Sequence, residues 1–390
     1  MISPEEALAR VFALVQPLDT ESLPLEHAAG RVLREAVCAQ RDQPPFAASA
    51  MDGYGVGPDA QAGANLRLIG EAAAGHAFSG ALSTGEAVRI FTGAPIPQGV
   101  ARVVLQEDIA RDGDRITLPE RLDQSTHIRP RGADFTQGDI VTAPRRLSAV
   151  ALALLASMNC PNVTVSRRPD VAIIATGDEL VMPGGTPRAD QIIASNAFAI
   201  KALAEAEGAR ARILPIAADT ETSLRAVFDL ASGADMIVTI GGASVGDHDL
   251  VGPVADMLGA KRSFYKIALR PGKPLMAGTL GKSLLLGLPG NPVSSIVCAH
   301  LFMRPALRAM LGLGEWPLPT ATATLACDLP ANGPRTHYMR ATLGPGPTIT
   351  PVGNQDSSLL TVLAGADALL VQPAGDGPRK AGAPMRYIAL

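Results

Sequence analysis

Hydrophobic residues recur at helical spacing at the start of the chain and again near residue 150. Ser3-Pro-Glu-Glu6 has the form of a capping box with proline at the first helical position, and apolar residues follow at helical spacing from Ala7 to Val15. A second helix is predicted from Ser148 to about Met158. Between the helices, glycine and proline interrupt short apolar runs, which predicts a β-rich insert. We expect the two segments that flank this insert to pack together as one discontinuous unit.

From Pro169 onward, short apolar strands alternate with amphipathic helices, which is typical of a parallel α/β layer. We predict strands at 171–176, 212–216, 235–240 and 283–288, and helices at 195–207, around 224–231 and at 250–258. After the last strand, Asn291 is expected to cap a further helix that Pro292 begins. Beyond Pro317, short alternating segments separated by turns predict a small β domain.

The composition limits the classes of protein to which the chain belongs. A chain of 390 residues with 47% hydrophobic content can bury more than one core. Its 34 basic and 37 acidic residues leave no net attraction to nucleic acid or to an anionic membrane, and an aromatic content of 4% offers no stacking platform for bases. Four cysteines without a C-x-x-C pair disfavour a zinc site and fit a reducing compartment. We therefore expect a cytoplasmic protein that binds neither nucleic acid nor membrane.

Carboxylates follow three of the predicted strands. Glu179 comes after the first strand and Asp219 after the second, and Asp247 and Asp249 come after the third, behind the glycine pair Gly241-Gly242. Ligands of an open α/β sheet bind beyond the carboxyl ends of its strands, and Mg²⁺ prefers oxygen ligands. The sequence therefore predicts a phosphate-facing loop with a metal option. In the alternative interpretation, Asp219 and Asp247 or Asp249 only cap helices, and Glu179 is a solvated loop charge.

Positive charge is concentrated between residues 261 and 273. Lys266, Arg270 and Lys273 lie near a Pro271-Gly272 turn, where they are able to bind oxyanions. The alternative is a solvated basic face. The six histidines show no metal-ligand spacing, and His300 falls on an apolar helical stripe, so we expect it in the core. The sequence contains neither a G-x-S-x-G motif nor a P-loop, which argues against the simplest hydrolase and P-loop classes.

Short motifs are spread over nearly the whole chain. They are Pro44-Pro-Phe46, Ser49-Ala-Met-Asp-Gly-Tyr54, Phe91-Thr-Gly-Ala-Pro95, Gln106-Glu107, Arg131-Gly-Ala-Asp134, Thr176-Gly-Asp-Glu-Leu180, Gly241-Gly-Ala-Ser-Val-Gly246 with Asp249, Pro271-Gly-Lys-Pro274 and Pro289-Gly-Asn-Pro-Val293. In this order they resemble the molybdopterin molybdenumtransferase family, which includes the E domain of gephyrin. Each motif is weak alone, but the set is specific.

The resemblance implies a multidomain α/β fold and an elongated homodimer whose active cleft is shared between subunits. It combines a molybdopterin-binding α/β domain, a β-rich insert, a discontinuous elongated helical/β domain and a C-terminal β barrel. The corresponding boundaries are 1–43 with 135–167 for the elongated domain, 44–134 for the insert, 168–315 for the α/β domain and 316–390 for the barrel.

The resemblance also implies Mg²⁺-dependent insertion of molybdenum from molybdate into adenylylated molybdopterin, with release of AMP. The expected catalytic residues are Asp52, Asp134, Glu179, Asp219 and Asp249, of which Glu179, Asp219 and Asp249 would organise the metal. The expected substrate-binding residues are Thr92, Gly241, Gly242, Ser244, Lys266, Arg270, Lys273, Pro289, Asn291 and Ser357. Asp52 and Asp134 lie in the insert, so we expect them to act in the other subunit's site. Molybdopterin adenylyltransferase and apo-molybdoenzymes are expected as transient partners.

The chain departs from the family pattern at a few positions. Ala47 and Ala48 replace acidic and amide residues, Ala101 replaces an aspartate, Arg270 replaces a lysine, and the loop that carries Ser357 is a loose match. These departures leave tungstate open as a substrate in place of molybdate.

Two other functions remain as alternatives. A molybdopterin adenylyltransferase would share the α/β domain but would need neither the insert nor the barrel. A scaffold that uses the fold to cluster partners would expose large apolar patches and bind pterin poorly.

Overall fold

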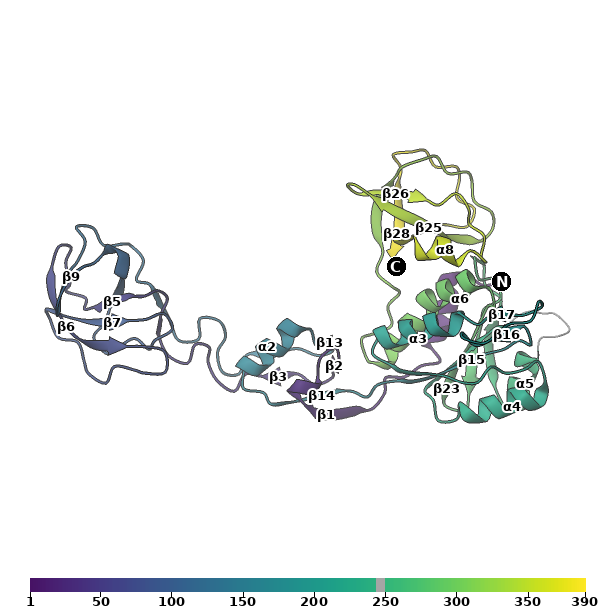
Figure 1. Cartoon of the computed structure of the whole chain (residues 1–390), viewed down its shortest axis with the longest axis horizontal. Helices are drawn as coiled ribbons and strands as arrows, with labels where there is room; N and C mark the ends of the chain where they lie inside the picture. Colours follow the sequence, from purple (N-terminus) through teal and green to yellow (C-terminus); the bar gives the residue numbers. More distant parts are fainter. Residues whose placement is uncertain (243–249) are drawn as a thin grey trace. The chain divides into compact units, whose positions relative to one another are not determined.

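The computed structural model describes residues 1–242 and 250–390 (Figure 1). The chain divides into two compact units. The first, unit 1, comprises Met1–Glu21 and Ser166–Leu390, and the second, unit 2, comprises Ser22–Val165. No helix within the described ranges is long and apolar enough to cross a membrane.

Unit 1 contains a six-stranded sheet with the order β18-β15-β19-β23-β22-β20. The first four strands are parallel, as the sequence predicts, and β22 and β20 add antiparallel pairings at one edge. The second predicted strand starts two residues earlier than expected and ends before Pro215, which has no N–H to donate to a neighbouring strand. The strands are β15 (Asp170–Ala175), β18 (Arg210–Ile213), β19 (Met236–Ile240), β20 (Lys261–Tyr265), β22 (Met276–Leu280) and β23 (Ser283–Leu288).

Helices cover both faces of this sheet. Successive strand residues point to opposite sides, and because both sets are apolar, each face needs a covering layer. Val171 and Ile173 of β15 pack with α1, α3, α6 and α7, whereas Ala172 and Ile174 pack with α4 and α5 on the other face. The helices are α1 (Pro4–Phe12), α3 (Asn196–Ala206), α4 (Glu221–Leu230), α5 (Val251–Met257), α6 (Pro292–Cys298), a π-helical segment (Ala299–Met303) and α7 (Arg304–Met310). As predicted, Ser3 caps α1, its Oγ accepting a hydrogen bond from Glu6 N (3.1 Å).

The C-terminal part of unit 1 is a closed five-stranded barrel. Its strands run β25-β26-β24-β28-β27, and β27 pairs back with β25. Closure leaves no free edge among the five strands, and β21 adds one more parallel pairing to β25. The elements are β21 (Leu269–Arg270), β24 (Ala321–Leu325), β25 (Thr336–Gly344), β26 (Thr348–Pro351), α8 (Leu360–Ala364), β27 (Ala368–Gln372) and β28 (Pro384–Ala389). The predicted small β domain is confirmed.

Unit 2 is rich in short strands, which confirms the predicted β-rich insert. Its largest sheet has the order β8-β5-β7-β6-β10-β9. The strands of this sheet are β5 (Gly53–Val56), β6 (Asn65–Ala72), β7 (Glu86–Ile90), β8 (Arg102–Leu105), β9 (Ala110–Asp112) and β10 (Arg115–Thr117).

The two segments that flank this sheet in sequence pack together. Strands β2 and β3 pair with β13 and β12, and Ala28 and Leu33 share a core with Leu147 and Leu155. The remaining elements are β1 (Thr20–Pro24), η1 (Leu25–His27), β2 (Val32–Leu33), β3 (Val37–Cys38), β4 (Ala48–Ser49), η2 (Gln106–Asp108), β11 (Ile128–Arg129), β12 (Ile140–Val141), β13 (Arg145–Arg146), α2 (Ala149–Ser157) and β14 (Asn162–Ser166). The expected discontinuous arrangement is present, while α1 contributes to the core of unit 1. The four predicted domain boundaries remain a prediction.

Candidate functional site

A cavity of about 780 Å³ lies at the edge of the unit 1 sheet where β15, β19 and β23 end. Residues that follow each of these strands line it, so the predicted convergence of strand ends is found in the structure. Of the predicted site residues, those that line the cavity are Glu179, Asp219, Gly241, Gly242, Pro289 and Asn291.

The glycine pair after β19 has a backbone conformation that residues with a side chain rarely adopt. Gly241 and Gly242 have φ angles of +90° and +61°. A Cβ on Gly241 would stand 2.9 Å from Thr176 O, and one on Gly242 would stand 2.2 Å from a Val251 methyl carbon. The pair therefore lets the chain turn tightly at the cavity wall.

Asp219 lies at the cavity beside the start of α4, but it does not cap that helix. The N-cap is Thr220, whose side chain accepts a hydrogen bond from Ser223 N (3.2 Å). The backbone N–H of Asp219 itself donates to Asp178 Oδ1 (3.1 Å). The interpretation of Asp219 as a helix cap is thus wrong.

Glu179 belongs to a loop that is tied back to the sheet region. Its carbonyl accepts a hydrogen bond from Ile192 N (2.7 Å), next to the short parallel pair β16 (Leu180–Val181) and β17 (Ile192–Ile193). A Cβ on Gly177 would stand 2.2 Å from Glu179 Oε2, so the carboxylate lies directly over this glycine. Glu179 is exposed and lines the same cavity as Asp219.

A loop of the barrel forms part of the cavity wall. Asn291 occupies the N-cap position of α6, but its side chain makes no capping hydrogen bond and instead donates to Ser357 Oγ (2.9 Å). Val293 N donates to Ser357 O (3.1 Å), and the adjacent Ser358 lines the cavity. The expectation that Asn291 caps with its side chain is therefore corrected, because this amide holds the loop instead.

The same loop is anchored from below by the fully buried Arg340. Arg340 Nη2 donates to Asp356 O (2.9 Å), and the Gln355 side chain pairs with both the N–H and the carbonyl of Arg340 (2.9 Å each). Within the described residues, Arg340 Nε and Nη1 and His337 Nε2 are buried without hydrogen-bond partners. Burial and then the Arg270 charge lower the pKa of His337 to about 4, and burial lowers the pKa of Arg340. Arg270 and Arg340 thus set a positive potential beside the neutral His337.

The three predicted basic residues do not line the cavity. Arg270 and Lys273 are exposed, and Lys266 is half-buried with its Nζ 5.2 Å from the centre of the Tyr265 ring. Lys266 has a φ of +69°, and its N–H donates to Leu275 O (3.1 Å). Pro274, next to Lys273, does line the cavity. The predicted residues Ser244 and Asp249, with Asp247, lie outside the described residues.

Two predicted residues meet in unit 2. Asp52 Oδ1 accepts hydrogen bonds from Thr92 N (2.7 Å) and Thr92 Oγ1 (2.8 Å). The backbone bond first, then the hydroxyl bond and the nearby Arg89 charge hold the pKa of Asp52 below its usual range. Asp134 is exposed in a separate loop, where its N–H donates to Gln43 O (2.9 Å).

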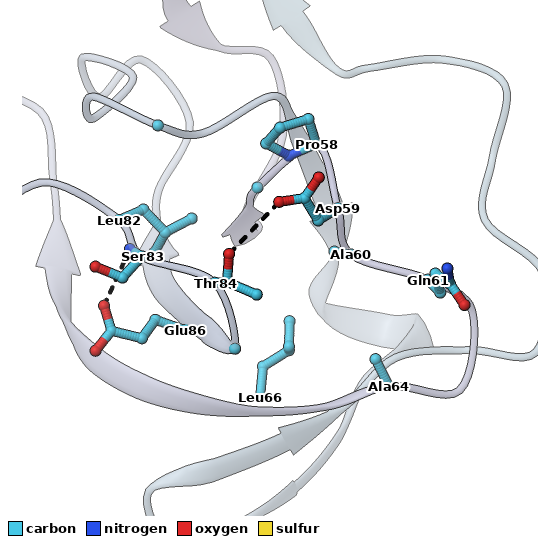
Figure 2. A pocket seen from close by; sticks show the side chains of 13 residues that line it. Pro58, Asp59, Ala60, Gln61, Ala64, Leu66, Leu82, Ser83, Thr84 and Glu86 are labelled. Carbon is cyan, nitrogen blue, oxygen red and sulfur yellow. Dashed lines mark hydrogen bonds between the residues drawn. The ribbon is translucent and has the colours of Figure 1, made fainter.

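Unit 2 also has a cavity that sequence analysis did not predict. It measures about 390 Å³, and none of the predicted site residues lines it (Figure 2). Thr84 Oγ1 donates to Asp59 Oδ2 (3.5 Å), and Glu86 accepts hydrogen bonds from Ser83 N (3.1 Å) and Arg67 (2.7 Å). Its acidic groups are thus engaged by neighbouring side chains and backbone.

Sequence reasoning missed several residues that shape the main cavity. Asn196 begins α3 and donates to Gly290 O (2.7 Å), which fixes the turn after β23. Asp178 orients Asp219, and Ser358 supplies a wall. Asp178 and Ser358 stand beside Glu179 and Ser357 in sequence, which was the available signal.

His300 is buried as expected, accepts from Arg304 Nη1 (3.0 Å), and has its pKa lowered to about 4 by burial.

No group of three or more His, Cys, Asp or Glu side chains gathers in a metal-binding cluster among the residues that the structure describes. Glu179 and Asp219 nevertheless offer two carboxylates to one cavity. Since Mg²⁺ usually takes one or two protein carboxylates and keeps part of its water shell, this donor set fits such an ion.

Three family profiles match successive parts of the chain. The MoeA N-terminal region (domain I and II) matches residues 2–159, the probable molybdopterin binding domain matches 172–309, and the MoeA C-terminal region (domain IV) matches 322–390.

Known proteins resemble the chain over nearly its full length. A molybdopterin molybdenumtransferase of a Nostoc species is 35% identical, covering 94% of this chain and 88% of its own, and that of Haemophilus influenzae is 35% identical, covering 84% and 82%. The crystal structure of the molybdopterin biosynthesis MoeA protein from Pyrococcus horikoshii is 28% identical, with a TM-score of 0.83 over 100% of this chain and 99% of its own. The chain therefore belongs to the molybdopterin molybdenumtransferase family, and it is a transferase of molybdenum cofactor biosynthesis.

Proposed function

We propose that the protein inserts molybdenum from molybdate into adenylylated molybdopterin in a Mg²⁺-dependent reaction that releases AMP. The observation that carries this proposal is the cavity of unit 1, where two carboxylates, a glycine turn and the barrel loop with Ser358 meet. Family membership supplies the substrate class, and the cavity supplies groups of the required chemistry.

In this proposal, the phosphates of the substrate face the backbone turn at Gly241-Gly242 and the turn from Pro289 to Asn291. Ser244 and Ser357 contribute hydroxyls, and Lys266, Arg270 and Lys273 bind oxyanions of the nucleotide or of molybdate. The unpaired buried donors Nε and Nη1 of Arg340 support an oxyanion near Arg270, because such donors are costly to leave unsatisfied.

Glu179, Asp219 and Asp249 would hold the magnesium ion, which when bound neutralises phosphate charge. Asp178 keeps the backbone of Asp219 in place through its hydrogen bond. Water would attack the pyrophosphate, and a new P–O bond would form as the P–O bond to the AMP leaving group breaks. This step would depend mainly on how the protein positions the reacting groups and compensates their charge, without a covalent enzyme intermediate.

We further propose that the protein acts as a cytoplasmic homodimer with a shared site, in which Asp52, Thr92 and Asp134 of one subunit complete the cavity of the other. Molybdopterin adenylyltransferase would deliver the substrate and apo-molybdoenzymes would accept the product. The four-domain division at 43/44, 134/135, 167/168 and 315/316 is part of the same proposal.

The test is AMP release from adenylylated molybdopterin by the purified protein, with and without Mg²⁺ and molybdate, together with activation of an apo-molybdoenzyme. We expect release and activation only when both are present. Tight pterin binding without release would favour a carrier or scaffold, and absence of pterin binding would contradict the proposal. Replacing molybdate with tungstate in the same assay measures the oxyanion preference.

A further inference from the structure

Arg89 lies between two aromatic rings in the centre of the unit 2 sheet. It belongs to β7 and stands opposite Tyr54 of β5. Its guanidinium carbon is 4.8 Å from the centre of the Tyr54 ring and 4.8 Å from that of Phe91. Stacking on both sides restricts the plane of the guanidinium and stabilises its charge.

The hydrogen bonds of Arg89 surround Asp52. Its Nη1 donates to the carbonyl of Gly53 (3.2 Å), the residue after Asp52, and its Nη2 donates to Gln106 Oε1. Gln106 N in turn donates to the carbonyl of Asp52 (3.2 Å). Arg89 therefore links both sides of the backbone that carries this aspartate.

Asp52 is held on its other side by Thr92, two residues beyond the end of β7. Both hydrogen bonds from Thr92 reach Oδ1, and within the described part of the chain Oδ2 has no hydrogen-bond partner. Arg89 of β7 is the charged group that acts on this carboxylate, and Gln106, which accepts from Arg89, donates through Nε2 to Glu107 Oε1 of η2 (3.2 Å). Arg89 is thus the cation that favours the ionised carboxylate.

We propose that Arg89 is a positioning residue for molybdenum insertion, which holds the Asp52–Thr92 pair in one geometry with Oδ2 free for substrate. This inference rests on the proposed function, because it assumes that Asp52 takes part in the reaction. It adds a residue that none of the expected site residues includes, and it gives the ring pair of Tyr54 and Phe91 a role.

The test compares Arg89→Met and Arg89→Lys with the control Arg67→Met, since Arg67 is an arginine of the neighbouring strand β6 that pairs with Glu86 and is 59% exposed. We expect R89M to lower kcat for AMP release about 10- to 100-fold with little change in KM, as for other residues that orient a functional group. The acid limb of the pH profile should move to higher pH. R89K should reverse part of this shift, because lysine keeps the positive charge. It should not restore the full rate, because lysine lacks the planar fork of arginine. R67M should behave like the wild type.

A direct titration separates this inference from the proposed function. The Asp52 carboxyl carbon is followed by NMR in the full-length protein without substrate, assigned with Asp52→Asn. A higher Asp52 pKa in R89M supports the contact of Arg89 with the Asp52 site independently of turnover, whereas normal turnover of D52N would contradict the proposed role of Asp52 and, with it, the role of Arg89 in the reaction. An unchanged Asp52 titration and an unchanged kcat in a folded R89M or R89K protein would overturn the inference.

Discussion

Single residues decide the shape of the cavity wall. Gly241 and Gly242 have backbone angles that side chains rarely adopt, and Asp219 is free of the capping role that its sequence position suggested. Both features are local. Comparing a substitution at each position with a control substitution distinguishes an effect on the site from a general loss of stability.

Gly241→Ala should damage the site more than a glycine replacement elsewhere. The new Cβ would stand 2.9 Å from a backbone oxygen at a φ of +90°, so the turn must shift. Gly233 is the matched control, because it has a φ of +82° with open space around its Cβ position. We expect about 1 kcal/mol of destabilisation for G233A from the left-handed backbone alone, and more for G241A. Denaturant unfolding and pterin binding measure both; equal losses in the two variants would contradict the role of the turn.

Asp219→Asn should impair AMP release, whereas its neighbour Thr220→Ala should impair stability. T220A removes the side-chain cap of α4 and should cost about 1 kcal/mol of stability while AMP release persists. D219N should leave stability nearly unchanged and abolish most of the Mg²⁺-dependent release. A D219N protein with normal turnover across a Mg²⁺ titration would remove Asp219 from the site.

At the scale of elements, the hydrophobic pattern predicted the helices and strands whose capping residues and periodicity lie within their own sequence. The capping serines of α1 and α2, the helix α5 and the strand Ser283–Leu288 all lie where the sequence indicated. The strand β22 was missed although Gly281, with a φ of +61°, begins the two-residue turn that joins it to β23, whereas the closure of β25 onto β27 depends on partners distant in sequence that no local pattern encodes. The site shows the same division: strand-end residues were found, whereas Asn196 and Arg89 act through contacts across the fold.

His300, in the π-helical segment between α6 and α7, should make the free energy of unfolding depend on pH. Burial lowers the pKa of His300 from 6.5 to about 4, so below pH 6.5 the unfolded chain binds a proton that the folded chain does not. Stability contributed by neutral His300 is therefore complete above pH 6.5 and is lost as the pH falls toward 4, by up to about 3 kcal/mol. His300→Gln should flatten this part of the profile in urea unfolding at pH 7.5 and 5, and exposed His27→Gln should not. Parallel profiles for H300Q and the wild type would contradict the assignment.

For the whole molecule, the arrangement of the proposed site residues over two units has a consequence for assembly. Glu179 and Asp219 belong to unit 1, whereas Asp52, Thr92 and Asp134 belong to unit 2. If one subunit completes the cavity of its partner, each active site draws on two chains. Mutations in the two units should then complement each other.

Mixing Asp52→Asn and Asp219→Asn proteins tests this directly. In a heterodimer of the two variants, one site receives both substitutions and the other receives neither. Random exchange makes half of the dimers mixed, each with one intact site, so AMP release should return to about a quarter of the wild-type rate in a symmetric dimer. Each variant alone, taken through the same exchange, is the control. If mixing restores no activity although tagged subunits show that exchange occurred, then Asp52 and Asp219 of the same chain must serve the same site, because only that arrangement leaves every heterodimer site with one substitution.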